Sequence, residues 1–274
     1  MTSNMNLPCS TTRIAPPGEE DYSHEPSNIS LCGDSYFFSG RFRSYGRVPK
    51  AIEENNELDF DHVHGEFTTE YIVLGPNERY FRCRRIREGD VAAMNTSDLE
   101  DYEEVTDFCD DHQIERPASL SFGPNGTFYI RSINDEEKWN LPSHIVHDAL
   151  QVTPTATQSG AQSLWLGAGG SWVIQYRNGS FNFNLQGRYA ALERALRQAQ
   201  EDGVRISGLA LNPLDENSFA CVFSDGLVEY QAGIAAFDGK EFEMWCEENF
   251  ELREIHKLLE EISEVTRRDW PFTT

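Results

Sequence analysis

The sequence is poor in basic residues and contains no long hydrophobic run. Its 274 residues include 23 Lys and Arg against 46 Asp and Glu, which gives a formal net charge of −23. Proteins that bind nucleic-acid phosphates or anionic membranes need clustered basic residues, so the composition argues against both kinds of partner. No run of about 18 consecutive apolar residues is present, so the sequence predicts no membrane-spanning helix.

Targeting and disulfide signals are also lacking. The N-terminal residues 1–8 contain neither the basic region nor the apolar stretch of a secretory signal. The six cysteines are scattered singly, without a Cys-x-x-Cys pair, which indicates reduced thiols in a core rather than a disulfide framework. We therefore expect a cytoplasmic or nuclear protein.

What the sequence does contain is one local pattern that recurs five times. Each copy consists of an apolar residue, a turn rich in Gly, Pro and Asn, and an aromatic residue that opens a new apolar run. The aromatic residues are Tyr36, Tyr80, Phe128, Trp172 and Phe219. Their spacings of 44, 48, 44 and 47 residues are typical of solenoids, propellers and arrays of repeated units.

Each copy also predicts short strands joined by tight turns. In the fourth copy we expect strands at 163–166, 172–176 and 180–185, with an Asn178-Gly179 hairpin turn before the last. The strands expected in the other copies are 29–31, 36–38 and 41–42; 71–74 and 80–86; 119–122, 128–133 and 138–141; and 206–211, 219–223 and 227–230. Three short strands in about 45 residues suit the blade of a β-propeller.

Helices are expected between several copies and near the C-terminus. Pro142 suits the first turn of a helix over 143–150, and a helix over 188–200 would end at Gly203. Residues 252–265 carry apolar side chains at intervals of three and four, which predicts a long amphipathic helix.

Two segments are strongly acidic. Residues 98–111 hold eight carboxylates and no basic residue, and residues 241–264 hold nine acidic against two basic residues. We interpret both as solvated faces or loops, with recognition of a partner as the alternative.

The repeated strand–turn–strand pattern resembles β-propeller repeats of the WD-type and tachylectin-like groups, over residues 29–246. The Gly-His and Trp-Asp signatures of WD repeats are absent and no lectin-specific motif is present, so the resemblance implies a fold but no ligand. It implies a mainly β protein with helical insertions, arranged as a five-bladed propeller whose repeated aromatic residues form the core. The alternative is an α+β fold, with an antiparallel sheet and helices on one side.

The expected organisation has three parts. Residues 1–27 have no periodic apolar pattern and are predicted to be a flexible tail. Residues 28–246 form the repeat domain. Residues 247–274 form the C-terminal amphipathic helix and tail, packed on that domain.

Two pairs of histidines are the candidates for metal binding. His62 and His64 would lie on one face of a strand, and His144 and His147 on one face of a helix. No cysteine neighbour completes a ligand set in either place. Structural or surface histidines are therefore the preferred interpretation, and we predict neither a metal nor a cofactor.

No catalytic motif is recognisable. A Gly-x-Ser-x-Gly elbow is absent, and the glycines of 167–170 precede a strand rather than the helix of a phosphate-binding loop. Trp139 and Trp245 are expected near loop or helix junctions, where an indole could stack on a ligand such as a sugar. Burial in the core is the preferred interpretation of these tryptophans, and Trp139 and Trp245 are kept as the candidates for ligand binding.

These observations predict a non-catalytic, acidic interaction scaffold that binds a protein or peptide partner. The negative charge would attract a basic partner. The first alternative is a carbohydrate-binding lectin, and the second is a propeller-type hydrolase that uses dispersed carboxylates. Enzymatic activity is left open, with the preference against it.

Overall fold

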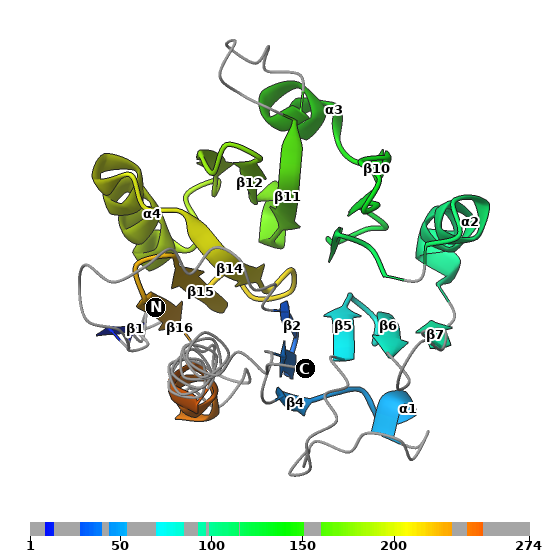
Figure 1. Cartoon of the computed structure of the whole chain (residues 1–274), viewed down its shortest axis with the longest axis horizontal. Helices are drawn as coiled ribbons and strands as arrows, with labels where there is room; N and C mark the ends of the chain where they lie inside the picture. The colour runs from blue at the N-terminus through cyan, green and yellow to red at the C-terminus, as the bar shows by residue number, and fades with distance from the viewer. Residues whose placement is uncertain are drawn as a thin grey trace, which may run out of the picture.

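The computed structural model describes residues 9–13, 28–39, 44–53, 70–84, 93–96, 99–114, 116–150, 160–231 and 240–248. These residues form a mainly β protein with five small antiparallel sheets. Figure 1 shows the sheets around a common centre, with the first strand of each sheet nearest to it.

Each copy of the sequence pattern becomes one sheet. The first sheet contains β2 (Asn28–Cys32), β3 (Ser35–Ser39) and β4 (Ser44–Arg47), and the second contains β5 (Glu70–Leu74), β6 (Tyr80–Arg84) and β7 (Ala93–Thr96). The third contains β8 (Ser119–Phe122), β9 (Phe128–Arg131) and β10 (Glu137–Asn140), and the fourth contains β11 (Ala161–Leu166), β12 (Trp172–Tyr176) and β13 (Phe181–Asn184). The fifth contains β14 (Ile206–Leu211), β15 (Phe219–Phe223) and β16 (Leu227–Gln231), together with β1 (Cys9–Arg13). The predicted strands agree with these bounds within a few residues, except that the short strand expected at 41–42 lies outside the described residues.

The recurring pattern has the same structural meaning in all five sheets. The apolar residue before the turn ends the apolar part of the first strand and pairs, across the hairpin, with the aromatic residue that opens the second strand. The five register pairs are Leu31–Tyr36, Leu74–Tyr80, Phe122–Phe128, Leu166–Trp172 and Leu211–Phe219. Each of the five aromatic side chains is at most 3% exposed. Their predicted equivalence is therefore confirmed.

The turn residues explain why the first strand ends where it does. In the third copy, the backbone N–H of Gly123 donates to the carbonyl of Thr127 at 2.7 Å and closes the turn. Asn125 and Gly126 adopt φ angles of 57° and 70°, a left-handed backbone that Asn and Gly reach at the lowest cost.

The apolar–aromatic pairs pack between neighbouring sheets. Leu166 and Trp172 of the fourth sheet join Tyr129 of the third, and Leu211 and Phe219 of the fifth join Val173 of the fourth. Further clusters of buried side chains join the second sheet to the third, the first to the second, and the fifth to the first. Each sheet therefore shares one buried cluster with each of two others.

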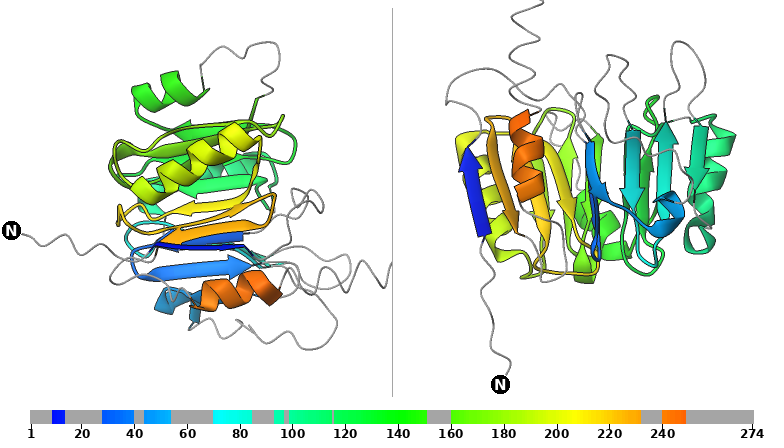
Figure 2. Two further views of the ribbon diagram at one scale, coloured as in Figure 1. Left: turned by 90° about the vertical axis from the view of Figure 1, so that its left-hand side faces the viewer. Right: turned by 90° about the horizontal axis from the view of Figure 1, so that it is seen from below.

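The fifth sheet has four strands because an N-terminal strand joins it. Strand β1 pairs antiparallel with β16, from Cys9 opposite Gln231 to Arg13 opposite Leu227. Figure 2 shows β1 at the outer edge of this sheet. The prediction that 1–27 is a tail throughout is corrected here, because backbone pairing with an open sheet edge orders a segment that has no apolar periodicity of its own.

Helices pack on the outer sides of the sheets. Helix α4 (Ala190–Asp202) buries Leu192, Leu196 and Ala199 against the fourth and fifth sheets, and Gly203 caps it with a φ of 71°. Helix α1 (Lys50–Glu53) contributes Ile52 to the cluster of the first and second sheets. A further helical stretch consists of α3 (Ser143–Ile145) and the single π-helical turn η3 (Val146–Leu150). The helices predicted at 143–150 and 188–200 are confirmed, whereas the one predicted at 252–265 lies outside the described residues.

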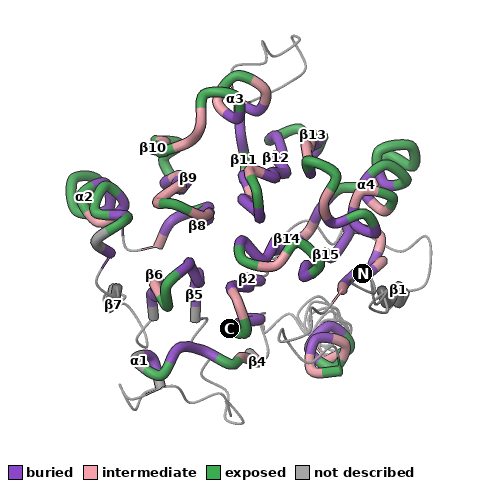
Figure 3. Tube along the Cα trace, turned by 180° about the vertical axis from the view of Figure 1, so that it is seen from behind, coloured by how far each residue is buried: buried purple, intermediate pink, exposed green. Residues whose placement is uncertain are grey.

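The two acidic segments are not simply solvated. After the short turn η2 (Glu100–Tyr102), helix α2 (Glu103–Asp111) buries Val105, Phe108 and Cys109 against the second and third sheets. Residues 240–248 are helical and bury Phe242, Trp245 and Cys246 against the fifth and first sheets. Figure 3 shows the contrast between the buried inner face and the exposed outer face of α2. In 240–248, the described part of the second segment, Glu241, Glu243 and Glu248 also accept hydrogen bonds from the hydroxyls of Tyr36, Tyr230 and Tyr45.

Two further expectations meet the structure. Five separate sheets with helices around them replace the single sheet of the α+β alternative. The cysteines whose burial is described are buried thiols, as expected for a reduced core; they are Cys32, Cys83, Cys109, Cys221 and Cys246.

Candidate binding cavity

The first strands of all five sheets line one cavity of about 830 Å³. Strands β2, β5, β8, β11 and β14 each contribute to its wall. The cavity therefore lies where the sheets converge, at the centre of the arrangement in Figure 1.

The wall of the cavity is uneven. The third and fourth sheets line it with the polar side chains of Ser119, Ser121, Gln162, Ser163 and Gln175. The second and fifth sheets line it mainly with apolar side chains, among them Val73, Leu209 and Ala210. The hydroxyl of Ser121 accepts a hydrogen bond from the backbone N–H of Leu166 at 3.0 Å, so one polar group also joins the third sheet to the fourth.

Gln175 is the most unusual residue of this polar wall. It lies on β12, is 5% exposed and faces the cavity. No described residue hydrogen-bonds its side-chain amide. The amide is open to the cavity, where it can donate to and accept from a ligand or water.

Four arginines gather at one end of the cavity. Arg131 ends β9 and Arg177 follows β12, whereas Arg116 and Arg205 precede β8 and β14. None of the described residues that line the cavity is Asp or Glu. This local excess of cations contrasts with the net charge of −23 for the whole chain.

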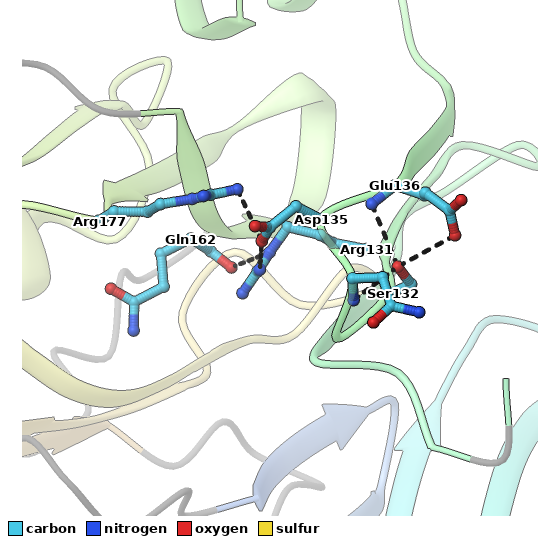
Figure 4. A network of polar contacts seen from close by, with 7 residues as sticks. Arg131, Ser132, Asp135, Glu136, Gln162 and Arg177 are labelled. Atoms are coloured by element: carbon cyan, nitrogen blue, oxygen red, sulfur yellow. Dashed lines mark hydrogen bonds and ion pairs between the residues drawn. The ribbon is translucent and has the colours of Figure 1, made fainter.

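One carboxylate bridges two of these arginines. Asp135 Oδ1 accepts from Arg131 Nη1 at 2.8 Å and from Arg177 Nη2 at 2.6 Å (Figure 4). Arg131 Nε also donates to the carbonyl oxygen of Gln162 at 2.9 Å, which links the third sheet to the fourth. The side chain of Arg131 is only 11% exposed, so these contacts fix it in place.

The other two arginines rest on neighbouring groups. The guanidinium carbon of Arg116 lies 5.1 Å from the ring centroid of Tyr71, a cation–π contact. Burial raises the pKa of Tyr71, and the positive charge of Arg116 opposes that rise. Arg205 packs over Gly179, where any Cβ would clash with its Nε.

Two more carboxylates lie beside the arginine end. Glu136 Oε2 lies 2.9 Å from His112 Nδ1 and also contacts the hydroxyl of Ser132. Glu137 pairs with Arg131 across β9 and β10. Burial raises the pKa of Glu137, and the charges of Arg131 and Arg177 oppose the rise.

The histidine candidates do not form a metal site in the described part of the chain. His144 and His147 are exposed on α3 and η3. No group of three or more potential ligands occurs among the described residues. His62 and His64 lie outside those residues.

The two tryptophan candidates have different surroundings. Trp139 lies on β10, is 39% exposed and does not line the cavity. Trp245 is 2% exposed and packs against Phe38 and Phe242, which agrees with the preferred core interpretation and removes it as a candidate for ligand binding. Trp165, which is partly buried, does line the cavity.

The sequence did give a signal for two of the cavity residues. Arg131 and Gln175 each stand three positions after the repeated aromatic residue, and they pair with Ser119 and Ser163 of the first strands. Polar pairs at this position interrupt otherwise apolar strands. Arg116 and Arg205 lie in connecting segments that do not repeat, and no sequence signal distinguishes them.

Comparisons with known proteins add a distant structural similarity. No family model matches the sequence, and no curated protein is significantly similar to it. The chain has a weak structural similarity to a catalytically inactive variant of virginiamycin B lyase from Staphylococcus aureus, determined with quinupristin, at 10% sequence identity and a TM-score of 0.28. The match covers 76% of this chain and 66% of the lyase chain. None of the described helices is long and apolar enough to cross a membrane.

Proposed function

We propose that the chain is a closed five-bladed β-propeller that binds a polar ligand in its central cavity without transforming it. Five inter-sheet clusters support a closed ring, because an open row of five sheets would need only four. The side chain of Asn212, in the fifth sheet, bonds both the backbone N–H and the carbonyl of Gly33 in the first, at 3.0 and 2.8 Å. These contacts lie at the seam of the proposed ring.

One observation carries the binding role. Gln175 is buried, faces the cavity and has no hydrogen-bond partner among the described residues. An amide that is held in the wall of a cavity and open to its interior can bond a polar ligand through both its oxygen and its nitrogen. The other polar side chains of the lining include serine hydroxyls, several amides, four guanidiniums and the imidazole of His112, groups that can bond a polar ligand from several sides.

A carbohydrate is the second candidate for the ligand. Trp165 lines the cavity together with several serine hydroxyls and Gln175. An indole beside hydroxyl and amide groups is the usual composition of a sugar site. Binding of a basic protein to the acidic outer helices remains a prediction, and a peptide partner could equally place one polar side chain in the cavity.

The test is a thermal-shift screen of sugars, amino acids, nucleotides and organic acids against three proteins. Gln175→Leu keeps the volume of the side chain and removes the amide. Gln198→Leu makes the same change on the exposed face of α4, away from the cavity. A ligand of the cavity should raise the Tm of the wild type and of Gln198→Leu, and should lose most of its effect on Gln175→Leu. Ligands that stabilise all three proteins equally, or a screen with no ligand at all, would contradict the proposal.

A further inference from the structure

The charge at the arginine end of the cavity is opposite to the net charge of the protein. Four of the 23 Lys and Arg residues line this one cavity, in a chain with 46 acidic residues. A net negative surface repels anions at long range, so cations gathered at a single concave site create a local attraction that the rest of the molecule lacks.

The two bridged arginines retain unused donors. A guanidinium carries five N–H groups. In the structure, Arg131 uses one for Gln162 and one for Asp135, and Arg177 uses one for Asp135. Asp135 thus orients both side chains and supplies a single negative charge to two positive ones. The remaining N–H groups of these two cavity-lining side chains have no acceptor among the described residues.

Arg116 adds a cation without a carboxylate partner among the described residues. Stacking on the face of Tyr71 holds the guanidinium plane but consumes none of its N–H donors. Arg205 lies across Gly179, next to the strand that ends at Tyr176 and close in sequence to Arg177. The four side chains therefore approach the same end of the cavity from the second to fifth sheets.

The nearby carboxylates do not cancel this charge. Asp135 is shared by two arginines, and Glu136 contacts His112. Glu137 stands beside Arg131 and is disfavoured as an anion by its burial. Arg116 lies in the lining itself as a further cation.

We propose that the ligand of the cavity is an oxyanion, namely a carboxylate or phosphate group on a small molecule, bound by the arginines at its end and by the amide of Gln175. This inference rests on the proposed function of the cavity and specifies the chemistry of its ligand. Planar guanidinium groups match carboxylate and phosphate oxygens with two parallel hydrogen bonds. The apolar wall of Val73, Leu209 and Ala210 would hold the remainder of the molecule.

The experiment measures binding of inorganic phosphate, pyrophosphate and citrate by titration calorimetry at constant ionic strength. Arg116→Gln and Arg177→Gln each remove one cation from the cavity, and Asp135 keeps Arg131 as its partner in the second variant. Arg194→Gln makes the same charge change on the exposed side of α4. We expect saturable binding of at least one of the three probes by the wild type. Loss of one charge-assisted contact should weaken it by about tenfold or more in both cavity variants, with no change in Arg194→Gln.

The outcomes separate this inference from the proposed function. Strong binding of a neutral ligand that needs Gln175 but is indifferent to Arg116 and Arg177 would overturn the oxyanion inference and leave the cavity function intact. Equal weakening by Arg194→Gln would show general charge screening and would also overturn it. Phosphate compounds and citrate are distinguished by their own affinities, so preference for one identifies the source of the oxyanion. Absence of binding by any neutral or anionic compound would reject the proposed function itself.

Discussion

Replacement of Asn212 by alanine should measure how strongly the first and fifth sheets are held together. The side chain of Asn212 is fully buried. Its oxygen accepts from the backbone N–H groups of Gly33 and Leu214, both at 3.0 Å, and its nitrogen donates to the carbonyl of Gly33 at 2.8 Å. Two of these three bonds cross between the sheets.

The magnitude follows from these contacts. A typical intramolecular hydrogen bond contributes about 0.5–1.5 kcal/mol net, so three bonds suggest a loss of about 2–4 kcal/mol. Gly33 is only partly buried, so water can reach some of its freed groups and the lower half of that range is expected. A loss of this size is a large share of the stability of an ordinary domain.

Urea unfolding, followed by tryptophan fluorescence and by circular dichroism, provides the assay. Asn217→Ala is the matched control, because Asn217 is exposed in the same turn. Asn212→Asp adds a second comparison, because the carboxylate of the variant would face the carbonyl oxygen of Gly33 and could not donate to it. Protonation turns the carboxylate into a donor, so the stability of this variant relative to the wild type should rise as the pH falls. A change for Asn212→Ala of less than about 0.5 kcal/mol, or one equal to the control, would refute the reasoning, since such a value is ordinary for surface substitutions.

Two other predictions concern the core. Trp172→Ala should cost about 3–5 kcal/mol in the free energy of unfolding, as for other buried aromatic side chains, whereas Trp139→Ala should cost less than about 1 kcal/mol; equal costs in urea titrations would contradict the assigned places of the two residues. Burial raises the pKa of the Cys32 and Cys109 thiols from an ordinary 9.0 to about 12. Because each thiol loses its proton more easily in the unfolded chain, its contribution to the free energy of unfolding is complete below pH 9 and decreases as pH rises towards 12. The decrease is at most about 1.4 kcal/mol per pH unit for each thiol. Urea midpoints at pH 8, 9.5 and 10.5 should therefore fall, and Cys109→Ala should fall less steeply over the same interval.

The sheets were predictable from the sequence because the residues that specify them act locally. Gly and Asn at the turns fix left-handed backbone, and the aromatic residue after each turn fixes which face is buried. Helix α2 was missed for a different reason. Its carboxylates dominate the composition of 98–111, although Val105, Phe108 and Cys109 have the spacing of one helix face. The apolar spacing in this segment predicts helix α2 better than its acidic composition does.

The cavity was harder to predict because its residues come together only through the arrangement of the sheets. Arg116 and Arg205 are far apart in the chain and occupy unrelated connections. Arg131 and Gln175 stand at equivalent register positions, but a polar residue in a strand can face solvent, a neighbouring sheet or a cavity. The arrangement of the five first strands around one cavity determines which of these three surroundings each polar residue has. Strand β1 was missed likewise, because its partner β16 lies at the other end of the described chain.

The pairing of β1 with β16 also has a consequence for the order of folding. The entropic cost of closing a loop grows slowly, by about 0.6 kcal/mol per doubling of its length. Contacts between residues far apart in the sequence, such as those of β1 with β16, nevertheless form late in folding. During synthesis, β1 leaves the ribosome long before its partner exists, while the hairpins of the first four sheets need only neighbouring segments. The fifth sheet is therefore expected to be the last to acquire its full set of strands, and a chain interrupted before β16 would leave β1 without the edge on which it docks.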